Sequence, residues 1–362
     1  MIRTPLIKVK GDAYDRGLKY GSEAKKFIDH NIEYYGNYCA EFLDLNWKEA
    51  IDKIESSISK TEEYDAEIFR EMEGIAEGAG RKIEDIFVLN ARYELAITSI
   101  AQKYLEGCTS YGFTSEVTKS GHVLLGQNWD FMHGLKDSCV FLMVEREDGP
   151  DIVMHLEAGT VGHKGLNSAG LGLCINALIS NEDKIEPAIP LITVISRKIM
   201  NSERLRDAIL AVLKAERSAS INFMIAHSGG EVLDLEITPK DVYFLYPDQG
   251  ILTHSNNFLT QRCNIKDLGK IPFPDSITRW HRFKRLIKPK SGQIDYEDIR
   301  RAASDHFDHP YSLCRHLDKP SKAEYRFETI FSMIMDLNEG TFHCTEGNPC
   351  ENKYQKVPFK FK

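Results

Sequence analysis

The stretch Gly107-Cys108-Thr109-Ser110 lies where the chain changes from helical to strand-like sequence. Before it, apolar and aromatic side chains recur among charged ones at the spacing of an amphipathic helix. After it, the spacing shifts towards the period of two that is typical of β-strands. We therefore expect a protein of the α+β class, with a mostly helical first part and a sheet-rich second part.

The same periodicities locate the individual elements. Helices are predicted at residues 12–42, 46–58, 62–78, 83–101, 190–216, 276–288 and 295–306. Strands are predicted at residues 110–117, 122–130, 139–146, 152–157, 221–227, 232–237, 242–246, 329–336 and 341–344. The sequence contains no repeat, low-complexity tract or Pro/Gly-rich linker, so we expect one domain over residues 1–362.

Composition excludes several classes of partner. The net charge is −8 and no block of like charge stands out, which argues against nucleic acid or an anionic membrane as a partner. No apolar stretch approaches the roughly 20 residues of a membrane-spanning helix, and residues 1–10 lack the apolar run of a signal peptide. The eight cysteines include no C-x-x-C pair and are interpreted as reduced thiols. We expect a cytoplasmic protein.

The Gly107–Cys108 pair has a specific chemical use. Glycine lacks a Cβ, so its carbonyl can be approached closely and its peptide bond can be strained. Attack by the Cys108 thiol on the Gly107 carbonyl would give a thioester, and water would then free a new amino terminus at Cys108. An α-amino group with a pKa near about 8 can act as the base for its own side chain. The alternative for any single cysteine is an inert, buried one.

Several motifs surround this pair in a recognisable order. Gly126-Gln127-Asn128-Trp129-Asp130 follows the Gly-Cys-Thr element, and Asn90-Ala91-Arg92-Tyr93-Glu94 precedes it. Thr253 to Phe258 and then Asp305 to His316, which ends in Cys314-Arg315-His316, come later. With these motifs the chain resembles, over roughly residues 10–350, the acyl-coenzyme A:6-aminopenicillanic acid acyltransferase family. That family is peptidase family C45 of the N-terminal-nucleophile (Ntn) hydrolase superfamily.

The resemblance implies a fold, a maturation step and catalytic roles. The fold is a four-layer αββα sandwich, and the precursor is a zymogen that cuts itself between Gly107 and Cys108 into residues 1–107 and 108–362. Cys108 matches the nucleophile, Asp130 the carboxylate that organises the new amino terminus, and Asn256 the oxyanion donor. Arg326 matches the family's late active-site arginine. Asn257 departs from the histidine that the family usually has at that position, which puts this neighbour of the oxyanion donor in doubt.

The two fragments are expected to stay together, because the apolar helical faces of residues 1–107 need the rest of the core. The product is then one folded unit with a nick. Association of such units into a homo-oligomer is compatible with the sequence.

Other residues of the motifs have two interpretations each. Trp129 is core or the wall of a substrate pocket. Asn128 contributes to the oxyanion site or only bonds the backbone at a bend. His316 is expected in a loop packed near the active site, where it could touch substrate.

The residues His306, His309, Cys314 and His316 could together ligate zinc. Their spacing fits none of the usual structural zinc sites. The family that the chain resembles needs no metal for its chemistry, so we expect neither a metal nor a cofactor.

The mature Cys108 would attack the carbonyl of a linear C–N amide bond and form an acyl-enzyme thioester. Water as acceptor makes the protein an amidohydrolase of N-acyl amines or small peptide-like substrates, which we favour. An acyl-coenzyme A-dependent N-acyltransferase is the alternative. The basic residues that could meet the coenzyme's phosphates also suit a solvated helix face: Arg279, His281, Arg282, Lys284 and Arg285. A further alternative is an unprocessed pseudoenzyme or binding protein on the same scaffold.

Overall fold

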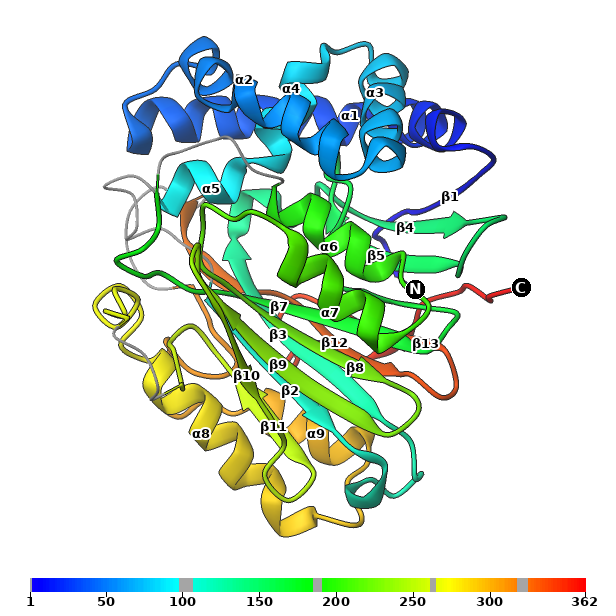
Figure 1. Ribbon diagram of the computed structural model, residues 1–362. Helices are drawn as coiled ribbons and strands as arrows, with labels where there is room; N and C mark the ends of the chain where they lie inside the picture. Colours follow the sequence, from blue (N-terminus) through cyan, green and yellow to red (C-terminus); the bar gives the residue numbers. More distant parts are fainter. Residues whose placement is uncertain (1, 98–106, 185–190, 261–264, 318–324) are drawn as a thin grey trace.

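Two β-sheets pack face to face between layers of helices (Figure 1). The computed structural model describes residues 2–97, 107–184, 191–260, 265–317 and 325–362. One sheet has eight strands in the order β1-β4-β5-β6-β7-β8-β9-β10, and the other has six in the order β11-β2-β3-β12-β13-β14. β2 and β3 of the smaller sheet contact β7 of the larger one. The arrangement confirms the predicted α+β class and αββα sandwich.

The six-stranded sheet carries the Gly107–Cys108 pair on one of its inner strands. Its strands, in sheet order, are β11 (Ile251–His254), β2 (Gly107–Phe113), β3 (Leu124–Met132), β12 (Phe327–Asp336), β13 (Thr341–Glu346) and β14 (Gln355–Lys356). All its pairings are antiparallel. Every residue of β2 and β3 is buried, which is expected for strands covered on both faces.

The eight-stranded sheet joins both parts of the chain. Its strands are β1 (Leu6–Lys10), β4 (Cys139–Glu145), β5 (Ile152–Glu157), β6 (Gly165–Asn167), β7 (Leu171–Ala177), β8 (Ile221–His227), β9 (Glu231–Ile237) and β10 (Val242–Leu245). β1 pairs with β4 in parallel. Residues before the predicted cut site therefore contribute a strand to a sheet formed mainly by residues after it.

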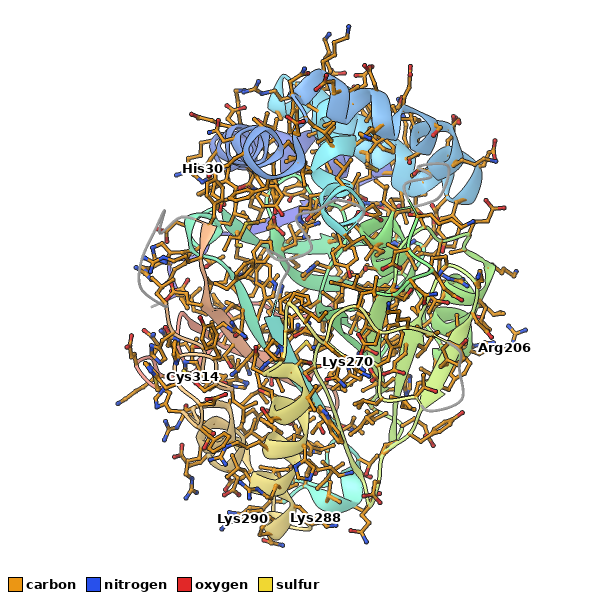
Figure 2. All side chains as sticks on the ribbon, turned by 90° about the vertical axis from the view of Figure 1, so that its left-hand side faces the viewer. His30, Arg206, Lys270, Lys288, Lys290 and Cys314 are labelled. Carbon is orange, nitrogen blue, oxygen red and sulfur yellow. The ribbon has the colours of Figure 1, made fainter. Side chains whose placement is uncertain are left out.

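Helices cover the outer faces. The α-helices before the predicted cut site are α1 (Ala13–Tyr38), α2 (Trp47–Tyr64), α3 (Ala66–Ala79), α4 (Ile83–Asn90) and α5 (Arg92–Ile97). Those after it are α6 (Ile192–Met200), α7 (Leu205–Lys214), α8 (Ser276–Ile287) and α9 (Tyr296–Ala303). α6 and α7 contact the eight-stranded sheet and α8 contacts the six-stranded one. In Figure 2, His30 of α1 and Lys288, just after α8, mark opposite ends of the molecule. Among the described residues, no helix combines the length and the apolar character that crossing a membrane requires.

Most predicted elements are present, with shifted ends. The predicted helix over residues 83–101 is divided at Ala91 into α4 and α5, and its residues 98–101 lie outside the described part. The predicted helix over 190–216 is also two helices. Five strands were not predicted from the sequence, namely β1, β6, β7, β11 and β14.

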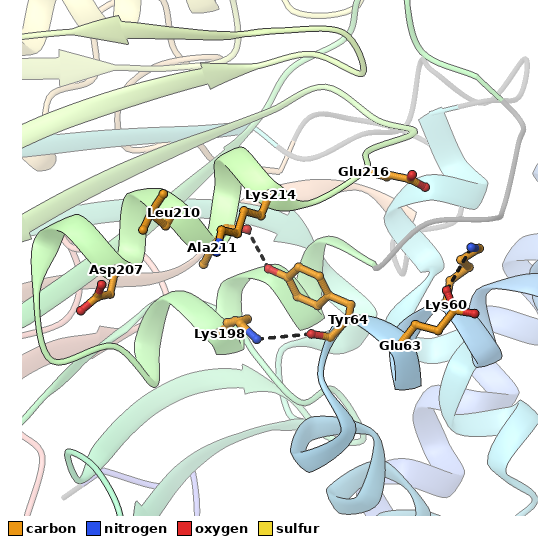
Figure 3. Close-up of a pocket in the computed structure, with 9 residues that line it drawn as sticks. All are labelled: Lys60, Glu63, Tyr64, Lys198, Asp207, Leu210, Ala211, Lys214 and Glu216. Atoms are coloured by element: carbon orange, nitrogen blue, oxygen red, sulfur yellow. Dashed lines mark hydrogen bonds and ion pairs between the residues drawn. The ribbon is translucent and has the colours of Figure 1, made fainter.

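Contacts across the predicted cut site are extensive. Arg92 of α5 forms a buried ion pair with Glu157 of β5, with Nε 2.7 Å from Oε1. The Tyr64 hydroxyl at the end of α2 donates to the Ala211 carbonyl of α7 at 2.7 Å, and Lys198 of α6 donates to the Tyr64 carbonyl at 3.3 Å (Figure 3). The residues that form these two bonds line a surface hollow. None of the predicted catalytic residues lines it: Cys108, Asp130, Asn256 and Arg326.

Candidate active site

The pairing of β2 with β3 sets the geometry around Cys108. Cys108 lies opposite Trp129, and Gly107 lies opposite Asp130. Side chains alternate between the two faces of a sheet, so Cys108 and Trp129 share one face while Gly107 and Asp130 share the other. The Cys108 and Asp130 side chains therefore lie on opposite sides of the sheet at the Gly107–Cys108 peptide bond.

The Cys108 face looks into the space between the sheets. Both Cys108 and Trp129 are fully buried. The Lys164 ammonium lies 3.2 Å from the centre of the Trp129 ring and 2.8 Å from Nδ1 of His163. Burial, reinforced by the charge of Lys164, lowers the pKa of both His163 and His155 well below its ordinary value. Both imidazoles are thus kept neutral.

Asn256 holds the backbone of Cys108 in place. It follows β11, and its Oδ1 accepts hydrogen bonds from the Cys108 N–H and from Arg279 Nη2, both at 2.8 Å. Its Nδ2 donates to the Ala177 carbonyl at 3.1 Å. Two donors on one end and a carbonyl on the other fix the orientation of the amide. Among the described residues Nδ2 has this one acceptor, so its other N–H could serve the oxyanion donor role that the resemblance implies.

Two arginines and an aspartate extend this arrangement on the outer face. Arg279 of α8 donates through Nη1 to the Cys108 carbonyl and to Thr109 Oγ1, and through Nε to Asp275 Oδ2 at 2.7 Å. Arg315 Nη2 donates to the same Asp275 oxygen at 2.5 Å. Burial alone would raise the pKa of Asp275, but these two guanidinium groups outweigh it and lower that pKa. Asp275 therefore stays ionised and holds both arginines against β2.

Asp130 lies directly against Gly107, the residue before the predicted cut. A Cβ placed on Gly107 would be 3.2 Å from Asp130 Oδ2, so only glycine fits without displacing the carboxyl group. Thr329 Oγ1 donates to Asp130 Oδ1 at 2.6 Å, and Arg315 Nε is 3.4 Å from Oδ2. Among the described residues, the buried Oδ2 accepts no hydrogen bond. Burial raises the pKa of Asp130 to about 6, against the opposing charges of Arg315 and Arg279.

The other predicted residues lie further from this centre. Asn128 donates both amide hydrogens to backbone carbonyls, those of Ala303 and Leu313, each at 2.8 Å. The Arg326 carbonyl accepts from the His133 N–H at 2.9 Å, just beyond the end of β3. His316 Nε2 faces Cys314, Cys350 and His306. Within the described residues, Arg279 pairs with Asp275, and Arg315 pairs with Asp275 and Asp130.

Neither of these arginines has a catalytic role in the sequence-based prediction. The sequence suggests Arg279 only as a coenzyme A contact or as part of a solvated helix face, yet its side chain is buried. Arg315 belongs to the Cys314-Arg315-His316 motif that the sequence comparison singled out. Its position in that motif was the one sequence feature that could have pointed to a role at the site. Asp275 gave no signal, because an aspartate just before a helix is an ordinary turn or capping residue.

Comparisons with known proteins agree with the motifs. Residues 117–351, more than half of the chain, match the family described as acyl-coenzyme A:6-aminopenicillanic acid acyl-transferase. Over 336 residues the chain is 26% identical to the acyl-coenzyme A:6-aminopenicillanic-acid-acyltransferase 40 kDa form of Emericella nidulans, covering 91% of this chain and 89% of that one.

The chain is also similar to two solved structures of hydrolytic enzymes. A mutant of conjugated bile acid hydrolase from Clostridium perfringens is 13% identical with a TM-score of 0.42, covering 69% of this chain and 97% of that one. Penicillin V acylase from Agrobacterium tumefaciens is 13% identical with a TM-score of 0.43, covering 66% of this chain and 83% of that one.

Proposed function

We propose, from the premise that the chain belongs to the acyl-coenzyme A:6-aminopenicillanic acid acyl-transferase family, that it is a self-processing amidohydrolase with an N-terminal cysteine. Membership confirms the resemblance inferred from the sequence and the prediction of an Ntn-type enzyme of acyl transfer or amide hydrolysis. The observation that carries the finer proposal is the convergence on one peptide bond of Cys108, Asn256 and Asp130 from three separate segments.

The first proposed step is the cut. The Cys108 thiol attacks the Gly107 carbonyl, the C–N bond breaks, and the thiol proton ends on the Cys108 nitrogen. Asn256 Oδ1 already accepts from that nitrogen at 2.8 Å and would accept equally from the amine that forms. Water then cleaves the thioester, leaving a Gly107 carboxylate and a free thiol. Asp130 is ionised above about pH 6, and its carboxylate would then pair with the new ammonium group.

The second proposed step is turnover in the nicked enzyme. The α-amine of Cys108 takes the thiol proton, and the sulfur attacks the carbonyl of a linear amide such as an N-acyl amine. The remaining N–H of Asn256 Nδ2 and a backbone N–H stabilise the tetrahedral oxyanion, where one such donor contributes about 3 kcal/mol. The leaving amine takes a proton back from the ammonium group, and water releases the acyl group from Cys108.

Acyl transfer from acyl-coenzyme A is the second candidate, because the Emericella nidulans relative is named as such a transferase. The basic residues of α8 give it little support. Arg279 is committed to Cys108 and Asp275, Arg282 pairs with Asp305, and Lys284 pairs with Asp248. We therefore favour water as the acceptor, and a cytoplasmic location in which the thiols stay reduced.

Intact-mass analysis of wild type beside Cys108→Ala tests the processing claim. We expect fragments of 107 and 255 residues from wild type and an uncut chain of 362 residues from Cys108→Ala. An uncut wild type would support the pseudoenzyme alternative, and a cut Cys108→Ala would refute the assignment of the nucleophile. Screening the cut enzyme against N-acyl amines, with and without acyl-coenzyme A, then separates hydrolysis from transfer.

A further inference from the structure

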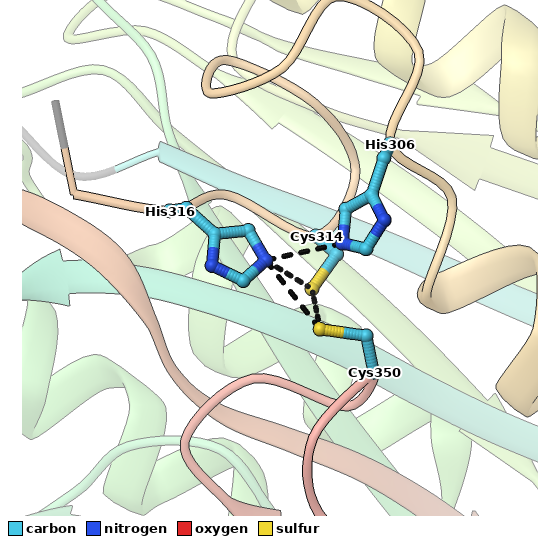
Figure 4. A group of neighbouring side chains, drawn as sticks. All are labelled: His306, Cys314, His316 and Cys350. Carbon is cyan, nitrogen blue, oxygen red and sulfur yellow. Dashed lines mark hydrogen bonds between the residues drawn. The ribbon is translucent and has the colours of Figure 1, made fainter.

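A second group of thiols and imidazoles lies outside the Cys108 site. His306, Cys314, His316 and Cys350 each point one ligating atom to a common centre, and these atoms all lie within 4.8 Å of one another. Figure 4 shows the four side chains converging from two loops, the one between α9 and β12 and the one after β13. Cys350 is 34 residues from His316, so the sequence spacing favours His309 as the fourth member instead.

Hydrogen bonding alone does not account for this convergence. His316 Nε2 is 3.1 Å from His306 Nε2, 3.4 Å from Cys350 Sγ and 3.5 Å from Cys314 Sγ. A neutral imidazole nitrogen carries either one proton or one lone pair, so it makes one hydrogen bond. Three groups crowd a single nitrogen that can serve only one of them.

A bound cation explains all the contacts at once. Zinc takes sulfur at about 2.3 Å and histidine nitrogen at about 2.0–2.1 Å, which in a tetrahedron sets the ligand atoms roughly 3.3–3.8 Å apart. The two sulfurs are 3.5 Å apart, and His316 Nε2 lies 3.4 and 3.5 Å from them. The contact between His316 Nε2 and His306 Nε2 is slightly shorter, at 3.1 Å. We propose that His306, Cys314, His316 and Cys350 bind one zinc ion. Binding releases the two thiol protons and leaves an uncharged complex of two thiolates and two imidazoles.

The number and surroundings of the ligands indicate a structural site. Four protein ligands fill a tetrahedron and leave no position for water or substrate. The Asn348 side-chain amide lies 3.6 Å from Cys314 Sγ and also donates to the Arg315 carbonyl at 2.7 Å. Such donors to ligand sulfurs orient and support metal sites. Cys314, marked in Figure 2, is buried.

The site would fix the arginine that serves the Cys108 centre. Cys314 and His316 direct their side chains to the cluster, whereas Arg315 between them reaches Asp275. The Arg315 N–H donates to Thr329 Oγ1, and its carbonyl accepts from the Thr329 N–H, each at 2.9 Å. The metal would hold one side of this segment while Arg315 reaches Asp275 and Asp130 on the other. The zinc assignment itself does not depend on the proposed function.

The metal content of the full chain tests the assignment. The protein is loaded with Zn²⁺ under reducing conditions, passed through a desalting column and measured by elemental analysis. We expect one zinc per chain in wild type and in His309→Ala, whose ring neighbours the cluster without belonging to it. We expect at least a tenfold loss of retained zinc in Cys350→Ala and His306→Ala.

A second measurement guards against variants that fail to fold. Wild type loaded with Co²⁺ should show sulfur-to-cobalt charge-transfer absorption and the intense visible bands of a tetrahedral site. Wild type without retained metal or such bands, an equal loss in His309→Ala, or a Cys314–Cys350 disulfide in reduced preparations would each overturn the assignment.

Discussion

The two cysteine sites of this enzyme are built from different neighbours. Around Cys108 lie an amide, two guanidinium groups and two carboxylates, which contact its backbone and one another. Around Cys314 lie a second thiol and two imidazoles, all aimed at the same point. The first set binds the backbone nitrogen and carbonyl of Cys108, whereas the second set directs two sulfurs and two imidazoles to one point, as the proposed zinc site requires. The groups around a thiol therefore say more about its chemistry than its burial does, since both sulfurs are buried.

Replacing a cysteine by alanine should affect turnover very differently at the two sites. Cys108→Ala removes the nucleophile and should lower turnover on the order of 10⁶-fold. Cys350→Ala should leave the chain able to cut itself, with turnover changed by less than about tenfold, because the residue is not at the reacting atoms. Turnover of an N-acyl amine is the measurement. Comparable losses in both variants would break the distinction between the sites.

Asn256→Ala tests the amide that holds Cys108. It removes the acceptor of the Cys108 N–H and the proposed oxyanion donor, so turnover should fall about 10²- to 10³-fold. Asn257→Ala is the matched control, since the Asn257 side chain accepts from Ser276 Oγ rather than from the Cys108 backbone. Steady-state rates compare the two. A larger loss in Asn257→Ala than in Asn256→Ala would contradict the assignment.

Asp130 should make folding stability depend on pH. Its pKa is raised to about 6 in the fold, so it favours the folded state fully below its unfolded pKa of about 3.9, and that contribution is lost as pH rises through 6. The loss amounts to about 3 kcal/mol. Chemical denaturation of Cys108→Ala from pH 4 to 7 should show it, and Cys108→Ala/Asp130→Asn should not. Identical pH profiles of the two proteins would count against a perturbed Asp130.

Some elements of the fold could be predicted from the sequence and others could not, for physical reasons. Amphipathic helices such as α1 and alternating strands such as β8 carry their period in the sequence and could be predicted from it. Short strands such as β6 and β11, of three and four residues, offer too few positions for a period to show. β1 resembles an ordinary N-terminal segment, because only its pairing with β4 makes it part of a sheet.

The residues of the candidate site likewise include some that could be predicted from the sequence and some that could not. Cys108, Asp130 and Asn256 stand in motifs that can be recognised in the sequence, and the structure brings their segments together. Arg279, Asp275 and Cys350 act through contacts across long loops, and nothing local sets them apart from surface residues of the same type. Their roles emerge only from the packing of α8 and the late loops against the six-stranded sheet.

Arg315→Lys probes the link between the two cysteine sites. Lysine keeps the charge but lacks the planar group that donates to Asp275 while lying beside Asp130. Losing one charge-assisted hydrogen bond costs about 2 kcal/mol. We expect turnover to fall about thirtyfold with zinc content unchanged. Arg300→Lys, at an exposed ion pair with Glu297, is the control and should change neither. Unchanged turnover in Arg315→Lys would separate the zinc cluster from catalysis.

Of these substitutions, Gly107→Ala should have the smallest effect on turnover by the cut enzyme. The new Cβ would press on Asp130 Oδ2 at 3.2 Å and misalign the scissile bond, so we expect self-cleavage to slow about tenfold or more. Turnover per cut molecule should match wild type, because residue 107 belongs to the other fragment once the bond is broken. The fraction cut over time and the rate per cut molecule are both read by mass spectrometry. Normal cutting of Gly107→Ala would show that the close approach is unimportant.

The most direct test of Cys108 as the N-terminal nucleophile is to locate the acyl group that a substrate leaves on the enzyme. Wild type is mixed with an N-acyl amine that it turns over, quenched in acid during steady state and mapped by peptide mass spectrometry. We expect a large fragment that begins at Cys108 and carries one acyl group on that residue. A fragment that begins elsewhere, or an acyl group on any other residue, would contradict it.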